Sequence, residues 1–329
     1  MINSIAVIGS NSFSGASFCK SMLERGVEVL GISRSLEPAD ALLPYKWIDH
    51  SKFQFHQLNL NHHLDKIESI LDARQIGTIY NFAAQSMVGQ SWEYPEHWFM
   101  TNVVSTVKFH NMLRHKDYLD KYIHISTPEV YGSCSGFVSE DQMFNPSTPY
   151  AVSRAAADMS LKTFFDVHQF PVVSTRAANV YGPGQQLYRI IPKTILSIML
   201  GHKLPLHGGG VSERSFIHID DVSRATQAIG ERGTNGETYH VSTLDTVSIR
   251  ALVENICQRM AKDINQVCEI SADRPGKDAA YLLDSNKVRN EFAWQDKISL
   301  EQGIEQTIEW AEQNFEQLKS MSLDYTHKQ

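Results

Sequence analysis

Short apolar segments alternate with segments of helical periodicity through the first half of the chain. The apolar segments have the length of buried strands and predict strands at residues 4–9, 27–33, 53–59, 78–83 and 121–127. Helical patterns lie between them, at residues 13–25, 64–74 and 95–115. This repeated strand–helix–strand order predicts an α/β fold, a Rossmann-type doubly wound parallel sheet with helices on both faces.

The second half is less regular, with glycine-containing loops near residues 182–184 and 208–210 and helical patterns at 248–261 and 299–318. A chain of 329 residues suits one large domain and a smaller one. We expect residues 1–180 to form a dinucleotide-binding domain, to which 214–240 return. Residues 181–213 and 241–329 then form a smaller, mainly C-terminal substrate-binding lobe.

Charge and cysteine content narrow the class of protein. The formal net charge of −7 argues against nucleic acid or an anionic membrane as partner, because neither attracts a net acidic surface. The four cysteines show no Cys-x-x-Cys spacing, so no metal site is expected, and His207, His218 and His240 are expected to be structural. The apolar runs are too short to span a membrane and no signal peptide is recognisable, which predicts a cytoplasmic protein with reduced thiols.

The first predicted strand runs into the sequence GSNSFSG at residues 9–15, and a helical pattern follows directly. Gly9 and Gly15 stand at the outer positions of a dinucleotide-binding turn and Ser12 at the middle one. The same residues also fit an ordinary strand-to-helix turn with a serine cap. The position of the turn at the head of a strand–helix–strand series favours a cofactor whose pyrophosphate lies at the helix N-terminus.

The second predicted strand ends at Ser33 and Arg34, where a site for NAD usually has an acidic residue that binds the ribose 2′-hydroxyl. An arginine suits a 2′-phosphate. NADP is therefore the favoured cofactor, with NAD as the alternative if Arg34 is only a solvated loop residue.

Six sequence blocks resemble those of a known family. They read YNFAAQS (80–86), STPEVYG (126–132), PYAVSR (149–154), NVYGP (179–183), RSFIHIDDV (214–222) and ADRPGKD (272–278). In this order they resemble the nucleotide-sugar 4,6-dehydratases of the extended short-chain dehydrogenase/reductase superfamily. The chain is most similar to the dTDP-glucose type and also resembles the GDP-mannose and GDP-N-acetylglucosamine types, so the base and the sugar stay open.

The resemblance implies the catalytic residues. Tyr150 is implied to remove the proton of the sugar 4-hydroxyl while hydride leaves C4, and the Thr127 hydroxyl to bind the same oxygen. Arg154 lies one helical turn after Tyr150, where the family has a lysine that lowers the tyrosine pKa and holds the cofactor ribose. Its broad planar fork predicts different cofactor contacts.

Glu129 is implied to remove the C5 proton before water leaves C6, and the hydride then returns to C6. An epimerase or a 4-ketoreductase has no such step. Pro128 stands where the dTDP-glucose type has an aspartate that protonates the leaving oxygen, and proline cannot donate a proton. Either Glu129 performs both tasks, or a water or another side chain serves.

The resemblance also implies the remaining contacts. Cofactor contacts are implied at Gly9, Asn11, Ser12, Phe13, Gly15, Ser33, Arg34, Asn59, Leu60, Ala83, Gln85, Tyr150 and Arg154. Substrate contacts are implied at Ser86, Thr127, Asn179, Arg189, Arg214, Arg274 and Lys277. The implied partners are a nucleotide-diphosphate sugar and a second copy of the chain, which would pair through helices near 95–115 and 148–169, with Phe109, Met112, Leu161 and Phe165 as interface candidates.

Two other functions are weighed against the dehydratase. The first is an epimerase or 4-ketoreductase on the same fold, to which Glu129 would be superfluous. The second is a non-enzymatic NADP-binding regulatory protein, which the departures at Ser12, Pro128 and Arg154 would allow. Retention of the hydroxyl, carboxyl and phenol groups favours the enzyme.

Overall fold

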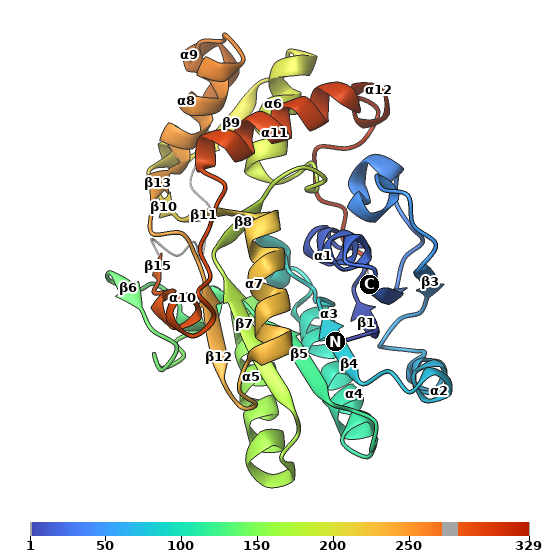
Figure 1. The fold of residues 1–329 in the computed structure, drawn as a ribbon. Helices are drawn as coiled ribbons and strands as arrows, with labels where there is room; N and C mark the ends of the chain where they lie inside the picture. The colour runs from blue at the N-terminus through green and yellow to red at the C-terminus, as the bar shows by residue number, and fades with distance from the viewer. Residues whose placement is uncertain (1, 272–281, 329) are drawn as a thin grey trace.

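The computed structural model describes residues 2–271 and 282–328. Its largest unit is a seven-stranded sheet in the order β12-β7-β5-β4-β1-β2-β3, and the paired neighbours are parallel. The strands are β1 (Ser4–Ile8), β2 (Glu28–Ser33), β3 (Phe53–Gln57), β4 (Thr78–Asn81), β5 (Lys121–Ile125), β7 (Val172–Ala177) and β12 (Thr238–Val241). The chain winds outward from β1 to β3 and then from β4 to β12, which confirms the predicted Rossmann-type fold class (Figure 1).

Helices cover both faces of this sheet because alternate side chains of each strand point to opposite sides. In β1, Ala6 and Ile8 pack into a core that includes residues of α2 (Leu64–Arg74), α4 (Thr106–Leu113) and α5 (Pro149–His168). Ile5 and Val7 pack on the other side, against α1 (Phe13–Glu24). Helix α7 (Ile219–Arg232) lies beside α1 on this second face.

Four of the five strands predicted from the sequence end earlier than expected. Strands β1, β3, β4 and β5 end at Ile8, Gln57, Asn81 and Ile125. Gly9 leaves the strand conformation with a φ of +86°, which begins the turn into α1. The residues that periodicity added to the strand ends therefore form the loops at the carboxyl edge of the sheet.

The helix predicted at 95–115 consists of three pieces. These are α3 (Pro95–Phe99), a π-helical turn η4 (Met100–Ser105) and α4. π-Helical turns are rare in proteins, and those that occur are often found at functional sites. Here the turn carries Asn102, whose side chain is completely buried.

A second core lies beyond the carboxyl edge of the sheet. It joins α6 (Ile190–Leu200), α8 (Ile249–Arg259) and α11 (Leu300–Gln313). Strand β9 (Leu204–His207) pairs there with β14 (Cys268–Ser271). Residues of α10 (Asn286–Phe292), by contrast, pack with α7 and β12 on the main sheet. The division into two domains stays a prediction.

Short elements complete the described part of the chain. The helical ones are η1 (Asp40–Leu42), η2 (Pro44–Lys46), η3 (Gly89–Trp92), η5 (Pro128–Tyr131), η6 (Gly208–Gly210), α9 (Ile264–Val267) and α12 (Phe315–Leu318). The short strands are β6 (Phe137–Val138), β8 (Asn179–Tyr181), β10 (Glu213–Arg214), β11 (Phe216–His218), β13 (Val247–Ser248) and β15 (Leu282–Leu283). Across residues 2–271 and 282–328, no helix has the length and apolar content that a membrane crossing requires.

Candidate active site

The glycine turn connects β1 to α1 at the carboxyl edge of the sheet. A Cβ on Gly9 would lie 2.7 Å from the Ala83 backbone nitrogen, and one on Gly15 would lie 2.2 Å from the Gly9 oxygen. The turn therefore requires both glycines. Ser12 caps α1, because its Oγ accepts from the Gly15 amide at 3.1 Å and donates to the Gly9 oxygen at 2.7 Å. The turn therefore has both features that the sequence allowed, a serine cap and glycines at positions of close backbone contact. The positive end of α1 faces the carboxyl edge of the sheet.

The three groups predicted to perform chemistry come together at the end of β5. Thr127 follows this strand and its hydroxyl donates to the Glu129 carboxylate on η5. Tyr150 lies in the first turn of α5, which begins after Thr148 caps the Ala151 amide at 3.1 Å. Burial and then the Glu129 charge raise the Tyr150 pKa, whereas Arg154, Thr127 and Arg189 lower it. A buried hydroxyl, a buried phenol and a half-buried carboxylate thus lie close together.

The predicted lowering of the Tyr150 pKa is wrong as a net effect. The pKa rises to about 12, because burial outweighs the positive charge of Arg154. The direction of the Arg154 contribution is as expected. Residue spacing locates the cation, but it does not reveal the cost of burying a phenolate.

Arg154 is 1% exposed and reaches back toward β5. Its guanidinium donates to the Ile125 carbonyl and lies 3.3 Å from Nε2 of His124. Its Nε is buried and has no hydrogen-bond partner among the described residues. The Arg154 side chain thus has a buried donor that the described residues do not satisfy.

Behind Arg154 lies a buried charge cluster that periodicity did not reveal. Asp158 accepts from Ser126 Oγ at 2.7 Å and from Arg176 Nη2 at 2.7 Å. Although burial opposes it, the charge of Arg176 and the contact with His124 hold the Asp158 pKa well below its usual range. Asp158 follows Arg154 by one helical turn, so it lies on the same face of α5. The spacing between Arg154 and Asp158 was visible in the sequence, whereas the pairing of Asp158 with Arg176 on β7 was not.

Asn102 is a second residue that sequence reasoning missed. Its Oδ1 accepts from the Gln85 amide at 2.8 Å, and its Nδ2 donates to the Gln85 carbonyl at 3.0 Å and to Ser153 Oγ at 2.9 Å. The π-helical turn places this side chain between the loop after β4 and α5. Asn102 therefore fixes the position of Gln85 relative to the helix that carries Tyr150.

The other predicted cofactor residues lie at the carboxyl ends of β1, β2, β3 and β4, in the loops that follow these strands or directly beside them. Ser33 Oγ accepts from the Asn11 amide at 2.9 Å. Arg34 Nη2 lies 3.5 Å from Gln85 Oε1, although the two residues follow different strands. Phe13 and Leu60 are buried, and Asn59 and Ala83 begin the loops after β3 and β4.

The predicted substrate residues are less closely grouped. Arg189 precedes α6 and contributes to the Tyr150 pKa, which places its charge near the phenol. Asn179 lies on β8 and Arg214 on β10, while Ser86 is exposed in the loop after Gln85. Arg274 and Lys277 lie outside the described residues.

The three histidines that were expected to be structural have protein partners. The His218 side chain caps α7, His240 bonds to the Tyr131 hydroxyl at 2.7 Å, and His207 contacts Ser271 at 2.9 Å. Within residues 2–271 and 282–328, no group of three or more potential metal ligands is found.

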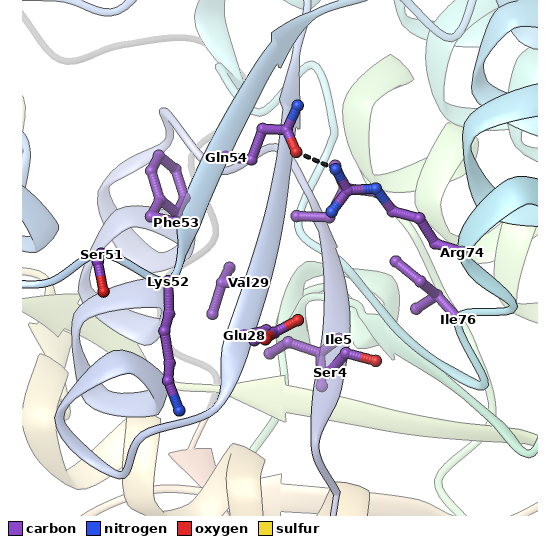
Figure 2. Close-up of a pocket in the computed structure, with 11 residues that line it drawn as sticks. Ser4, Ile5, Glu28, Val29, Ser51, Lys52, Phe53, Gln54, Arg74 and Ile76 are labelled. Atoms are coloured by element: carbon purple, nitrogen blue, oxygen red, sulfur yellow. Dashed lines mark hydrogen bonds between the residues drawn. The ribbon is translucent and has the colours of Figure 1, made fainter.

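One hollow near the sheet lies away from these residues. A volume of about 370 Å³ opens beside the amino ends of β1, β2 and β3. Figure 2 shows Ser4, Glu28, Lys52 and Arg74 among the side chains around it. The candidate catalytic residues are at the opposite edge.

A parallel sheet with a glycine turn, a Tyr-containing helix and a Thr-Pro-Glu loop at its carboxyl edge defines a nucleotide-binding enzyme of the extended short-chain dehydrogenase/reductase class. The family model for GDP-mannose 4,6 dehydratase matches residues 7–307. The chain belongs to this family and is a nucleotide-sugar 4,6-dehydratase, a hydro-lyase.

Individual relatives agree with this assignment. The dTDP-D-glucose 4,6-dehydratase of Mus musculus is 32% identical over 294 residues, which cover 87% of this chain and 79% of that enzyme. A trifunctional UDP-glucose 4,6-dehydratase/UDP-4-keto-6-deoxy-D-glucose 3,5-epimerase/UDP-4-keto-L-rhamnose-reductase of Arabidopsis thaliana is 31% identical over 254 residues. That match covers 76% of this chain and 38% of the plant enzyme.

Solved structures give the same fold. The dTDP-glucose 4,6-dehydratase of Streptomyces venezuelae with NAD and TYD bound superimposes with a TM-score of 0.89 at 27% identity, covering 95% of this chain and 98% of that one. UDP-glucuronic acid 4-epimerase of Bacillus cereus superimposes with a TM-score of 0.85 at 26% identity, covering 94% and 99%. Because an epimerase fits almost as well, the fold does not separate the two reactions, and the residues at the site must do so.

Proposed function

We propose that the protein converts a nucleotide-diphosphate hexose into its 4-keto-6-deoxy derivative, and that Thr127, Glu129 and Tyr150 perform the chemistry. The observation that carries this proposal is the Glu129 carboxylate beside the Thr127 hydroxyl, with its charge felt by Tyr150. An epimerase or a 4-ketoreductase needs no base at C5. The same carboxylate weighs against a non-enzymatic protein, because a binding site has no use for it.

Each group has one role in the proposed sequence. Tyr150 takes the proton of the 4-hydroxyl, and the Thr127 hydroxyl holds that oxygen. A bound nicotinamide dinucleotide would accept hydride from C4 and return it to C6. Glu129 removes the proton at C5, which the new ketone at C4 acidifies. The Tyr150 pKa of about 12 means that the phenolate depends on nearby positive charge, which Arg154 supplies.

The proton for the departing C6 oxygen comes from Glu129 in this proposal. Pro128 is buried and has no proton to give. Glu129, protonated by the C5 proton, can pass it to the C6 oxygen, so that water leaves and the carboxylate is restored. When hydride returns to C6, C5 takes a proton from solvent, and Tyr150 releases to solvent the proton that it took from the 4-hydroxyl. A water molecule or another side chain is the alternative donor.

For the cofactor we propose NADP rather than NAD. Arg34 at the end of β2 and the lack of an acidic residue there support a 2′-phosphate. The NAD bound to the Streptomyces relative is the argument for the alternative. The test is Arg34→Asp, measured as the ratio of NADP to NAD affinity. The ratio should reverse, and tight NAD binding that ignores the substitution would refute the assignment.

For the substrate we propose that Arg189, Arg214 and Asn179 meet the diphosphate and its neighbouring groups, together with Arg274 and Lys277. A net acidic protein must hold two phosphates with local cations. The base and the sugar stay open among the dTDP-glucose, GDP-mannose and GDP-N-acetylglucosamine types. We also propose that the enzyme acts in the cytoplasm, which the buried cysteines Cys19 and Cys257, outside any disulfide, support.

We further propose a homodimer, but the interface candidates need revision. Phe109 and Leu161 are at most 1% exposed and belong to the core of one subunit, and Met112 and Phe165 pack against it. The helices α3, η4 and α5 expose other apolar side chains instead: Phe99, Met100, Val104, Val152 and Met159. Such a patch supports a covering partner. Light scattering should give a dimer for the native protein and a monomer for Met100→Lys/Met159→Lys.

The function is tested with a substrate panel. Purified protein is incubated separately with dTDP-, UDP-, GDP- and CDP-hexoses, and products are identified by mass and NMR. A 4-keto-6-deoxy sugar should form from one of them, without net change of the nicotinamide. Accumulation of reduced cofactor in proportion to product would favour a plain dehydrogenase.

A further inference from the structure

The segment after α12 runs back across the candidate cofactor site. From Met321 to Lys328 its residues alternate between partly buried and exposed. The inward residues are Met321, Leu323, Tyr325 and His327, and the outward ones are Ser322, Asp324, Thr326 and Lys328. Alternation with a period of two is typical of an extended chain with one face against a surface. We call residues 324–328 the strap.

The first contacts of the strap are with the second core. Asp324 Oδ1 accepts from Lys193 Nζ at 2.9 Å, and Lys193 belongs to α6. The Tyr325 ring meets the Tyr188 ring edge-on, with centroids 5.2 Å apart. Because Tyr188 precedes Arg189, the strap here passes beside a residue proposed to hold substrate phosphate.

The His327 ring then enters an aromatic group on α3. It stacks on Trp98 with centroids 5.1 Å apart, and on His97 and Tyr94 at 5.1 Å and 5.2 Å. His97 Nδ1 and His327 Nε2 are 2.8 Å apart, a hydrogen bond between two imidazoles. Trp98 is completely buried, so His327 covers a surface that is fixed by the core.

The last contacts of the strap are made by the Lys328 carbonyl. It accepts from Arg34 Nη1 at 3.1 Å and from Gln85 Nε2 at 2.7 Å. Arg34 follows β2 and Gln85 follows β4, and these strands flank β1. The carbonyl therefore lies in front of the carboxyl end of β1, where the glycine turn begins. In Figure 1 the chain descends from α12 toward α1.

We propose that the strap occupies the cofactor site of the empty protein and that the dinucleotide must displace it in order to bind. The surface lined by Trp98, Arg34 and Gln85 thus has two alternative occupants, a segment of the chain itself and an anionic dinucleotide. A phosphate group can displace the Lys328 carbonyl from Arg34, because the guanidinium bonds more strongly to an anionic oxygen than to a neutral carbonyl oxygen. The proposal rests on the proposed cofactor site.

The consequence is a weakened apparent affinity for the cofactor. A ligand that binds only the open form has its dissociation constant raised by the reciprocal of the open fraction. Weakening the strap therefore tightens cofactor binding without any new contact. A strap that closed over bound cofactor would have the opposite effect.

The first test compares two variants of the full chain after removal of bound nucleotide. Tyr325→Ala/His327→Ala removes the inward rings, and Thr326→Ala changes an outward residue as matched control. By calorimetric titration with NADP⁺ and NAD⁺, the inward variant should bind roughly fivefold or more tightly than native protein, with the control unchanged. Equal or weaker binding by the inward variant would overturn the proposal.

The second test follows the strap itself. Native protein is treated briefly with chymotrypsin, and cleavage after Tyr325 is measured by mass spectrometry with and without NADP⁺. Displacement predicts faster cleavage when the dinucleotide is bound, and slower cleavage would show that the strap closes over it instead. Failure of the proposed function is a separate result: native and variant proteins alike would then bind no dinucleotide at all.

Discussion

The two edges of the main sheet differ in what they hold, although the same strands form both. At the amino edge a hollow of about 370 Å³ lies among Ser4, Glu28, Lys52 and Arg74 (Figure 2). The charged side chains there belong to a surface in contact with solvent, where Arg74 donates to Gln54 and Lys52 Nζ donates to the Gly26 carbonyl at 2.7 Å. The carboxyl edge has its chemistry in loops and buried groups. A hollow alone therefore does not locate an active site.

The carboxyl edge is different because neighbouring strands end there in loops that diverge, and helix N-termini point into the gap. Gly9, Arg34, Gln85 and Thr127 each begin such a loop or lie just inside it. Beneath these loops, in the interior of the domain, Arg154 and Asp158 are buried. Charges that are buried in this way keep their strength and shift the pKa of a neighbour.

The largest difference in activity between variants of the two edges is expected from loss of the base at the carboxyl edge. Tyr150→Phe removes the only atom that can take the 4-hydroxyl proton in the proposed sequence, so turnover should fall about a hundredfold or more. Turnover of the substrate identified in the panel measures this, with circular dichroism to confirm folding. Near-native turnover would remove Tyr150 from the mechanism.

The next effect concerns Glu129. In Glu129→Gln the amide keeps the shape of the side chain but cannot take the C5 proton. Oxidation at C4 should proceed and then stop, so nicotinamide absorbance should rise on mixing with substrate and not decay, and solvent deuterium should not enter C5. Normal C5 exchange in this variant would assign the base to another residue.

A smaller change is expected from Arg154 in the pH profile. The Tyr150 phenolate forms as pH rises toward its pKa of about 12, and Arg154 lowers that pKa. Arg154→Met removes the positive charge, so the pKa should rise and the increase of oxidation rate with pH should move to higher pH. Arg154→Lys keeps the charge and serves as control. An unshifted profile in Arg154→Met would mean that its charge does not act on Tyr150.

The smallest effect is expected at the amino edge. Glu28→Gln and Lys52→Met change two residues that line the hollow, on β2 and before β3. Neither touches the loops of the opposite edge, so kcat/KM should stay within about twofold of the native value and unfolding within about 0.5 kcal/mol. A large loss of activity in either variant would show that the hollow takes part in function.

Periodicity and motifs predicted the sheet and the glycine turn because both depend on local sequence. The alternation of apolar residues marks a strand, and Gly9 and Gly15 are required by backbone contacts inside one turn. The Thr127, Glu129 and Tyr150 group was predicted through the family resemblance, and the structure has these side chains near one another. Their roles stay predictions.

Four features depended on contacts between distant parts of the chain. Asp158 finds Arg176 on another strand, and burial of Tyr150 reverses the expected sign of its pKa shift. Phe109 and Leu161 are apolar helix residues, and periodicity does not tell whether such residues face the sheet or a second subunit. The strap alternates polar and apolar residues, but its partners at Arg34 and Gln85 lie far away in sequence.

The central claim is that one hydride moves from C4 to C6 of the same sugar. The direct measurement uses the substrate identified in the panel, carrying deuterium at C4, in ordinary water. NMR of the product should find the deuterium at C6. Deuterium found again at C4 would mark an epimerase, and deuterium lost to free reduced cofactor would mark a dehydrogenase; either result would contradict the account.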